Sequence, residues 1–112
     1  MNGNNLLILL LVNMGNYKRI SIVEAQGLMS DDATIVDVRD PQSYSMHHID
    51  NAVHVSNENI QQFIDDTDKT KPLIIYCYRG NSSQDAADYL SEEGFTNVYS
   101  MDGGFDEWSL NN

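Results

Sequence analysis

The chain has 112 residues, of which 41% are apolar, and its six basic and seventeen acidic residues give a formal charge of -11. This length and apolar share suit one globular domain with one hydrophobic core. So acidic a chain has few cations to neutralise phosphates, which argues against nucleic acid and anionic membranes as partners. A site for a small anion must therefore supply its own positive potential, from backbone amides or an arginine.

Cys77 is the only cysteine of the chain. A single cysteine excludes an internal disulfide, a CxxC redox pair and a zinc cluster built on cysteines. We therefore expect a reducing compartment and a cytoplasmic location. The His, Asp and Glu residues lack the spacing of metal ligands, so we expect neither a metal nor another cofactor.

The run Leu6–Val12 contains seven consecutive apolar residues. A membrane-spanning helix needs roughly 20, so we expect no membrane partner. As the core of a signal peptide, the run lacks a basic region before it and a small-residue cleavage site after it. Met14 offers an alternative start. We therefore expect residues 1–13 to be a disordered or misassigned extension, and residues 14–112 to form one domain.

From residue 17 onward, short β-type runs alternate with helical patterns. This alternation predicts an α/β fold with a mainly parallel, five-stranded sheet and helices on both faces. The expected strands cover residues 17–20, 33–38, 52–55, 73–76 and 97–100. The expected helices run from Ser21 to Met29, 41–46, from Ser56 or Asn57 to 65, 83–93, and onward from Gly103-Gly104.

Local signals support several of these boundaries. Ser21 and Glu24 have the spacing of a capping box, and Asp40 is a suitable N-cap before Pro41 at the first helical position. Residues 33–38 form a nearly continuous apolar run in which most residues are β-branched. Such a run is typical of a strand covered on both faces, so we expect it to be central in the sheet.

Cys77 comes directly after the most apolar expected strand, 73–76, which should also be central in the sheet. Ligands of parallel sheets gather at the carboxyl ends of the strands, which makes this cysteine a candidate nucleophile. The loop after it leads into a helix, whose unpartnered N–H groups and dipole provide positive potential. This environment lowers a thiol pKa from about 8.5 and favours the reactive thiolate.

The composition of the loop decides between two interpretations of Cys77. A lone cysteine at a strand end is commonly a buried small apolar residue. Here, however, Gly80 and Asn81 are residue types that accept positive φ, and Ser82 and Ser83 can cap the following helix. The composition of the loop therefore predicts that its backbone amides curl around one point. This favours the interpretation of Cys77 as a nucleophile.

Three motifs resemble those of the rhodanese family, in the usual order: Cys77-Tyr78-Arg79-Gly80-Asn81-Ser82-Ser83, Asp37-Val38-Arg39-Asp40-Pro41, and Asp102-Gly103-Gly104-Phe105 followed by Trp108. The resemblance covers about residues 17–110 and is strongest to short single-domain members. It implies a rhodanese-like three-layer fold with a five-stranded parallel sheet flanked by helices.

The family resemblance also implies a ping-pong reaction through Cys77. Its thiolate would take the outer sulfur of thiosulfate as a persulfide and pass it to a thiophilic acceptor such as cyanide, a dithiol or a thioredoxin-like protein. The loop residues Tyr78, Arg79, Gly80, Asn81, Ser82 and Ser83 would bind the substrate. Arg79 is the loop side chain able to attract the charge of the donor.

Other polar and aromatic residues are expected to be structural. We expect Asp37 and Arg39 to form a buried or half-buried ion pair, and His48 and His54 to make structural hydrogen bonds. His47 stands where the family has the glycine of a Gly-His-Ile element, which leaves the geometry of that turn open. We expect Phe105 and Trp108 to pack the last helix on the sheet.

Two alternative functions remain at this point. A cysteine phosphatase or arsenate reductase shares a cysteine at an amide-lined loop, but its pattern needs Cys-x5-Arg, and the residue six positions after Cys77 is Ser83. The other alternative is a sulfur carrier or regulatory module that delivers persulfide sulfur to a protein. The single cysteine supports it, because the persulfide must be discharged by an external acceptor.

Overall fold

The computed structural model describes residues 16–112, so the predicted extension at residues 1–13 lies outside the described residues. The described part forms five strands, at Lys18–Ile20 (β1), Thr34–Asp37 (β2), Val53–His54 (β3), Leu73–Tyr76 (β4) and Val98–Met101 (β5). They build one sheet in the order β1-β5-β4-β2-β3, and every neighbouring pair is parallel. The predicted five-stranded parallel sheet is therefore confirmed.

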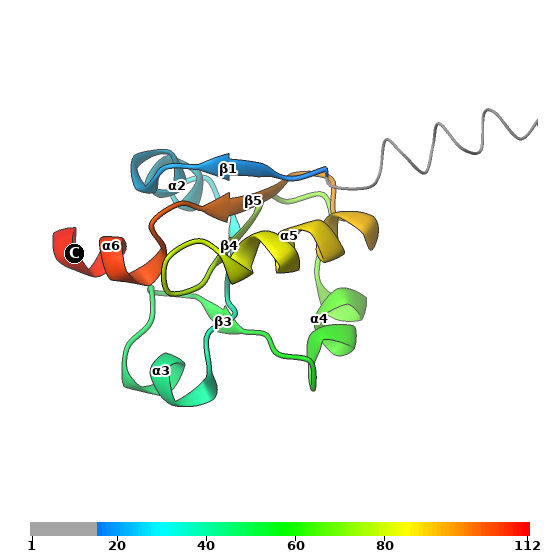
Figure 1. Ribbon diagram of the computed structural model, residues 1–112. Helices are drawn as coiled ribbons and strands as arrows, with labels where there is room; N and C mark the ends of the chain where they lie inside the picture. The colour runs from blue at the N-terminus through cyan, green and yellow to red at the C-terminus, as the bar shows by residue number, and fades with distance from the viewer. Residues whose placement is uncertain (1–15) are drawn as a thin grey trace, which may run out of the picture.

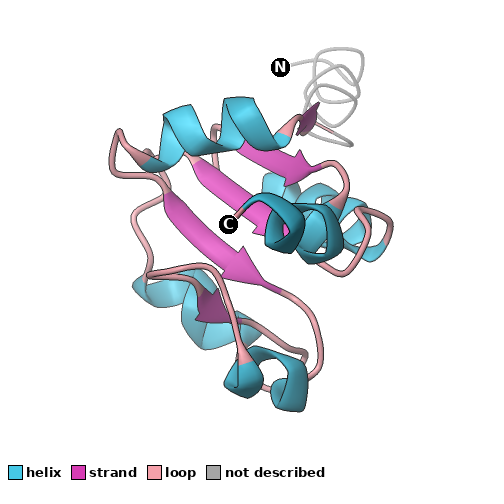
Figure 2. Cartoon of the chain, turned by 90° about the vertical axis from the view of Figure 1, so that its left-hand side faces the viewer, coloured by secondary structure: helices cyan, strands magenta, loops and turns pink. Residues whose placement is uncertain are grey.

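The helices are α2 (Ile22–Met29), α3 (Pro41–Met46), α4 (Ile60–Asp66), α5 (Ser82–Glu92) and α6 (Gly104–Asn111). They lie on both sides of the sheet (Figures 1 and 2). One buried cluster joins α4 and α5 to the sheet, and a second joins α2, α3 and α6 to its other face. The predicted three-layer α/β architecture is confirmed.

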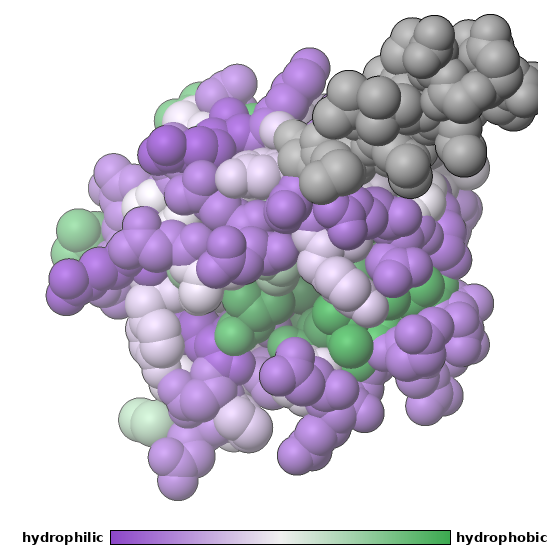
Figure 3. All heavy atoms as spheres, turned by 45° about the vertical axis from the view of Figure 1, so that its right-hand side comes forward, coloured by the Kyte–Doolittle hydropathy of each residue, from purple (hydrophilic) through white to green (hydrophobic). Residues whose placement is uncertain are grey.

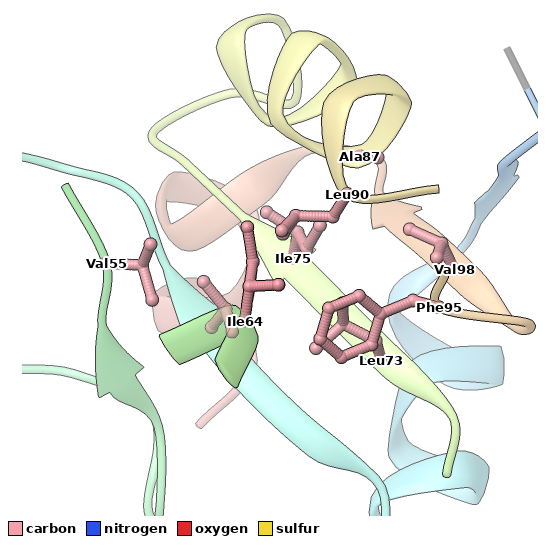
Figure 4. Packing of buried hydrophobic residues seen from close by; sticks show 9 residues of the cluster. Val55, Ile64, Leu73, Ile75, Ala87, Leu90, Phe95 and Val98 are labelled. Carbon is pink, nitrogen blue, oxygen red and sulfur yellow. The ribbon is translucent and has the colours of Figure 1, made fainter. Parts of the chain in front are cut away.

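Strand β4 is the centre of the molecule, because it is the middle strand and all four of its residues are fully buried. Successive side chains alternate between the faces. Leu73 and Ile75 pack beneath α4 and α5 (Figure 4), whereas Ile74 and Tyr76 join the cluster on the opposite face. The central position predicted for the strand before Cys77 is therefore confirmed, whereas the same prediction for β2 was wrong. Strand β2 is internal, between β4 and β3, and two strands that are both covered on both faces look alike in sequence.

The predicted helix starts are confirmed where a side chain caps the backbone. Ser21 and Glu24 form a reciprocal capping box, and the Asp40 carboxylate accepts from the Ser43 N–H with Pro41 at the first helical position. The predicted start of α4 was wrong, since the helix begins at Ile60. Residues 56–59 instead form a turn in which Ser56 N–H donates to Asn59 Oδ1 over 2.8 Å. The helical pattern of this segment therefore begins one turn later than its polar residues indicate.

Among residues 16–112, no helix is both long and apolar enough to cross a bilayer.

Replacing Ile75 by alanine tests the central position of β4. The side chain is fully buried between α5 and the sheet, so its removal leaves a cavity. We expect the free energy of unfolding in urea to fall by about 2–5 kcal/mol. Val23→Ala is the control, because Val23 lies on α2 with 77% of its surface exposed, and it should cost under about 1 kcal/mol. Equal losses in the two variants would contradict this placement of the core.

Candidate active site at Cys77

Cys77 directly follows β4 at the carboxyl edge of the sheet and is only 3% exposed. Its Sγ accepts hydrogen bonds from the Gly80 N–H over 3.2 Å and from the Ser83 N–H over 3.3 Å. The Ser83 hydroxyl lies 3.3 Å from the same sulfur. The loop between β4 and α5 therefore curls around the sulfur, as its composition predicted.

The surroundings of Cys77 favour its thiolate. Burial opposes ionisation and is the largest single influence on the thiol. Hydrogen bonds from the hydroxyls of Ser83 and Ser82, and then from the N–H groups of Ser83 and Gly80, together outweigh it and lower the pKa of Cys77 to about 7. A large fraction of this thiol is therefore ionised at neutral pH, as a sulfur nucleophile requires.

The shape of the loop depends on one left-handed residue. Gly80 has φ +98°, and a Cβ on it would lie 3.2 Å from the Gly103 nitrogen. The expected positive φ at Asn81 was wrong: Asn81 is right-handed, with φ -91°, because the turn at Gly80 already reverses the chain. The expected capping by Ser82 and Ser83 was also wrong, since α5 begins at Ser82 and its N-cap, Asn81, makes no side-chain capping bond.

The Ser83 hydroxyl contacts the sulfur of Cys77 instead of capping α5. It lies 2.8 Å from the hydroxyl of buried Ser100 on β5, as well as 3.3 Å from Cys77 Sγ. Ser100 was not identified from the sequence. A serine inside an otherwise apolar strand was the available signal, because a buried hydroxyl needs a partner.

The N-terminus of α6 holds the outer side of the loop. Phe105 N–H donates to the Cys77 carbonyl over 2.8 Å, and Asp106 N–H donates to the Tyr78 carbonyl over 3.0 Å. Gly104 has φ +58°, and a Cβ on it would lie only 2.5 Å from the carbonyl group of Tyr78. The Gly103-Gly104 pair, expected to open the last helix, therefore also permits α6 to contact the loop backbone.

The two large side chains of the loop are engaged at its rim. The Tyr78 hydroxyl bonds to the Asp40 carboxylate and to the Ser43 hydroxyl at the start of α3. This bond, with those from Ser43, lowers the pKa of Asp40 to about 2. Arg79 is 80% exposed, with its Nε 3.2 Å from Asp106 Oδ2. Of the predicted binding residues, Gly80 and Ser83 thus contact the sulfur through their backbone, whereas Tyr78 and Arg79 extend to α3 and α6.

Asp37 and Arg39 form the predicted ion pair. The guanidinium donates to both carboxylate oxygens, at 2.8–3.2 Å, and to the His47 carbonyl at 2.6 Å. Both side chains are buried, 0% and 3% exposed, and the guanidinium lies 4.0 Å from the centre of the Phe105 ring. Arg39 therefore ties the end of β2 to α6 and the segment after α3.

The histidines have structural partners. His48 Nδ1 lies 2.7 Å from the Tyr44 carbonyl and stacks on the Tyr44 ring, and His54 Nε2 lies 2.5 Å from the Arg39 carbonyl. His47 has an extended backbone, φ -169°, which any residue adopts, so the turn does not need a glycine there. Within residues 16–112, no three His, Cys, Asp or Glu side chains are grouped to hold a metal ion.

Comparison with known proteins places this architecture in a family, since the profile of the rhodanese-like domain matches residues 21–111. The chain belongs to the rhodanese-like domain family. This rhodanese-like chain is 50% identical, over 95 residues, to the thiosulfate sulfurtransferase GlpE of Ectopseudomonas mendocina, with 85% of this chain and 87% of the relative covered. It is 46% identical over 92 residues to the thiosulfate sulfurtransferase GlpE of Pseudomonas paraeruginosa, covering 82% and 84%.

Solved structures agree with the family fold. A rhodanese-like domain protein from Staphylococcus aureus superimposes with a TM-score of 0.71 at 26% identity, covering 81% of this chain and 90% of that one. A human single-domain sulfurtransferase gives a TM-score of 0.75 at 17% identity, covering 84% and 96%. At 17% identity, the likeness to the human protein supports the fold of this chain and nothing more.

The pH dependence of alkylation tests the environment of the rhodanese-like loop. Because thiolate reacts and thiol does not, the rate with iodoacetamide should rise as the pH passes through about 7 in the wild type. Ser83→Ala removes the hydroxyl at the sulfur, so the midpoint should move to higher pH. The control Ser91→Ala removes a hydroxyl from the other end of α5, where it donates to the Asp88 carbonyl, and should leave the midpoint unchanged. An unshifted midpoint in Ser83→Ala would contradict the role of its hydroxyl.

Two glycine substitutions test the contact between α6 and the loop. Gly104→Ala combines positive φ with a backbone clash, and should cost about 2–3 kcal/mol in unfolding free energy and slow alkylation of Cys77 at pH 7. Gly27→Ala, inside α2 with open space around it, should instead stabilise by about 0.5–1 kcal/mol. Wild-type alkylation in Gly104→Ala would show that the contact does not shape the loop.

Proposed function

We propose that this protein is a thiosulfate sulfurtransferase with Cys77 as its nucleophile. The observation that carries the proposal is the Cys77 sulfur, which is held by the N–H groups of Gly80 and Ser83 with a pKa of about 7. It agrees with the names of relatives about 50% identical over most of the chain, which are thiosulfate sulfurtransferases.

In the first half-reaction, the Cys77 thiolate attacks the outer sulfur of thiosulfate. A bond forms between Sγ and that sulfur, the sulfur–sulfur bond of thiosulfate breaks, and sulfite leaves with the electron pair. The N–H groups of the loop stabilise the negative charge that remains on the persulfide. They also provide the local positive potential that an anionic donor needs on a chain of charge -11.

The other loop residues act around this centre. The backbone of Asn81 and Ser82 continues the amide-lined turn into the start of α5, where the helix dipole favours an anion. Arg79 is exposed at the rim beside Asp106, and as the loop's cation it attracts the incoming donor. Tyr78 binds the substrate through its backbone, and its hydroxyl holds the loop to α3.

In the second half-reaction, a thiophilic acceptor removes the sulfur. Cyanide, a dithiol or a thioredoxin-like thiolate attacks the outer persulfide sulfur, and the Cys77 thiolate leaves. The acceptor is external because the chain has one cysteine and so no resolving thiol. A reducing compartment keeps this thiol available, so the enzyme acts in the cytoplasm.

Phosphatase chemistry is disfavoured by the length of the loop. Its family pattern places an arginine six residues after the cysteine to clamp a phosphate. Here that residue is Ser83, whose backbone and hydroxyl already contact the sulfur. The loop therefore lacks the arginine that would clamp a phosphate.

Intact-mass spectrometry after incubation with thiosulfate tests the proposed function. The wild type should gain one sulfur, about 32 Da, and lose it when cyanide is added, because cyanide accepts the outer sulfur. Cys77→Ser should show no gain. Ser91→Ala, which removes a hydroxyl at the end of α5 away from the sulfur, is a folded control that should still gain the sulfur. A wild type without the adduct would overturn the proposal.

A further inference from the structure

An apolar groove of about 610 Å³ lies between α4 and α5. Figure 3 shows hydrophobic residues gathered in a hollow of this face, surrounded by hydrophilic ones. The apolar side chains that line the groove are Val38, Val55, Ile60, Ala86, Tyr89 and Leu90. Thiosulfate and cyanide are small and polar, so neither half-reaction with them uses such a surface.

One lining residue of the groove, Val38, follows β2 at the same end of the sheet at which Cys77 follows β4. The register of β2 and β4 pairs Asp37 with Tyr76, so the next residues, Val38 and Cys77, lie opposite each other. Val38 N–H donates to the Tyr76 carbonyl and fixes this position. On α5, Ala86 is one turn beyond Ser83, whose N–H contacts the sulfur. A molecule in the groove therefore extends toward the Cys77 loop.

The rim of the groove is acidic. Asp85 is part of its lining, and among the side chains from residues 16–112 that line it none is basic. Glu93 and Glu92 lie near Tyr89 and raise the pKa of its hydroxyl. The floor fits an apolar side chain, and the rim attracts lysine or arginine next to it.

We propose that this groove docks a protein acceptor of the Cys77 persulfide, which presents a thiol next to an apolar side chain and basic residues. The inference rests on the proposed function. Charge favours such a partner over a second copy of the chain, which carries the same charge of -11, and over the chain's own Leu6–Val12 segment, which has no basic residue.

The transfer to a docked protein needs no further reactant. The partner's thiolate forms a bond with the outer sulfur of the Cys77 persulfide, and the bond from that sulfur to Sγ breaks. The electron pair returns to Cys77 as its thiolate, and the partner carries the persulfide. Electrons therefore balance between the two proteins, without an external oxidant or reductant.

Synthetic cysteine peptides test the groove by single-turnover discharge of the loaded enzyme. Three probes share one scaffold and differ around the cysteine: leucine with lysines, serine with lysines, and leucine with glutamates. The leucine–lysine peptide should remove the sulfur on the order of tenfold faster than either other probe, and this advantage should shrink with added salt. The rate with cyanide is measured on the same loaded protein.

Tyr89→Ala links this preference to the groove. Tyr89 is 42% exposed on α5, so its truncation removes part of the lining with little change to the core. The leucine–lysine peptide should lose most of its advantage, whereas discharge by cyanide should stay within about twofold. Val23→Ala, an exposed apolar position on the opposite face of the sheet, should retain the full peptide preference.

Several results would overturn the groove proposal while leaving the sulfurtransferase intact. The first is an equal rate of discharge by the three peptides, and the second is an equal slowing of discharge by peptide and by cyanide in Tyr89→Ala. The third is a dimer in sedimentation that Tyr89→Ala dissociates. The fourth is faster discharge by the peptide after deletion of residues 2–13. The last two would assign the groove to a second copy or to the chain's own segment. Failure of the wild type to load sulfur is seen before any peptide is added and overturns the proposed function itself.

Discussion

Two backbone hydrogen bonds hold the outside of the loop that surrounds Cys77, and the rest of the site depends on them. They run from the N–H groups of Phe105 and Asp106 to the carbonyls of Cys77 and Tyr78. With these carbonyls engaged by α6, the N–H groups of Gly80 and Ser83 are free to face the sulfur. Helix α6 thus determines which backbone groups of the loop face the sulfur, although the loop precedes this helix by about 25 residues in sequence.

The buried ion pair of Arg39 and Asp37 supports the same arrangement from the other side. The guanidinium lies over the Phe105 ring, so it positions the first turn of α6 as well as the end of β2. A charged pair in this place is costly unless every donor is satisfied, and here the guanidinium bonds to the carboxylate and to a carbonyl. The end of β2, the segment after α3 and the first turn of α6 therefore meet at one arginine.

Much of the fold could be predicted because its local signals act on neighbouring residues. The capping box of α2, the Asp40-Pro41 start of α3 and the apolar run of β4 were correct for that reason. The prediction of Cys77 at an amide-lined turn also required only the position of the strand end and the glycine after it.

The errors concern choices that depend on tertiary contacts. The central position predicted for β2 was wrong because β2 and β4 are both covered on both faces, and the order of strands is set by connections and helix packing. The hydroxyl of Ser83 was expected to cap α5, but the nearby sulfur and the Ser100 hydroxyl use it instead. Neither competitor is adjacent in sequence, so propensity alone could not rank them.

The burial of Cys77 has a consequence for the selectivity of the thiol. Activation and access are separated here: hydrogen bonds make the sulfur anionic, while the surrounding chain leaves only 3% of the residue exposed. A reagent is then sorted by its size before its chemistry matters. Small anions pass this filter more readily than bulky disulfides, so the reactive form of the thiol persists among larger oxidants that would consume an open thiolate.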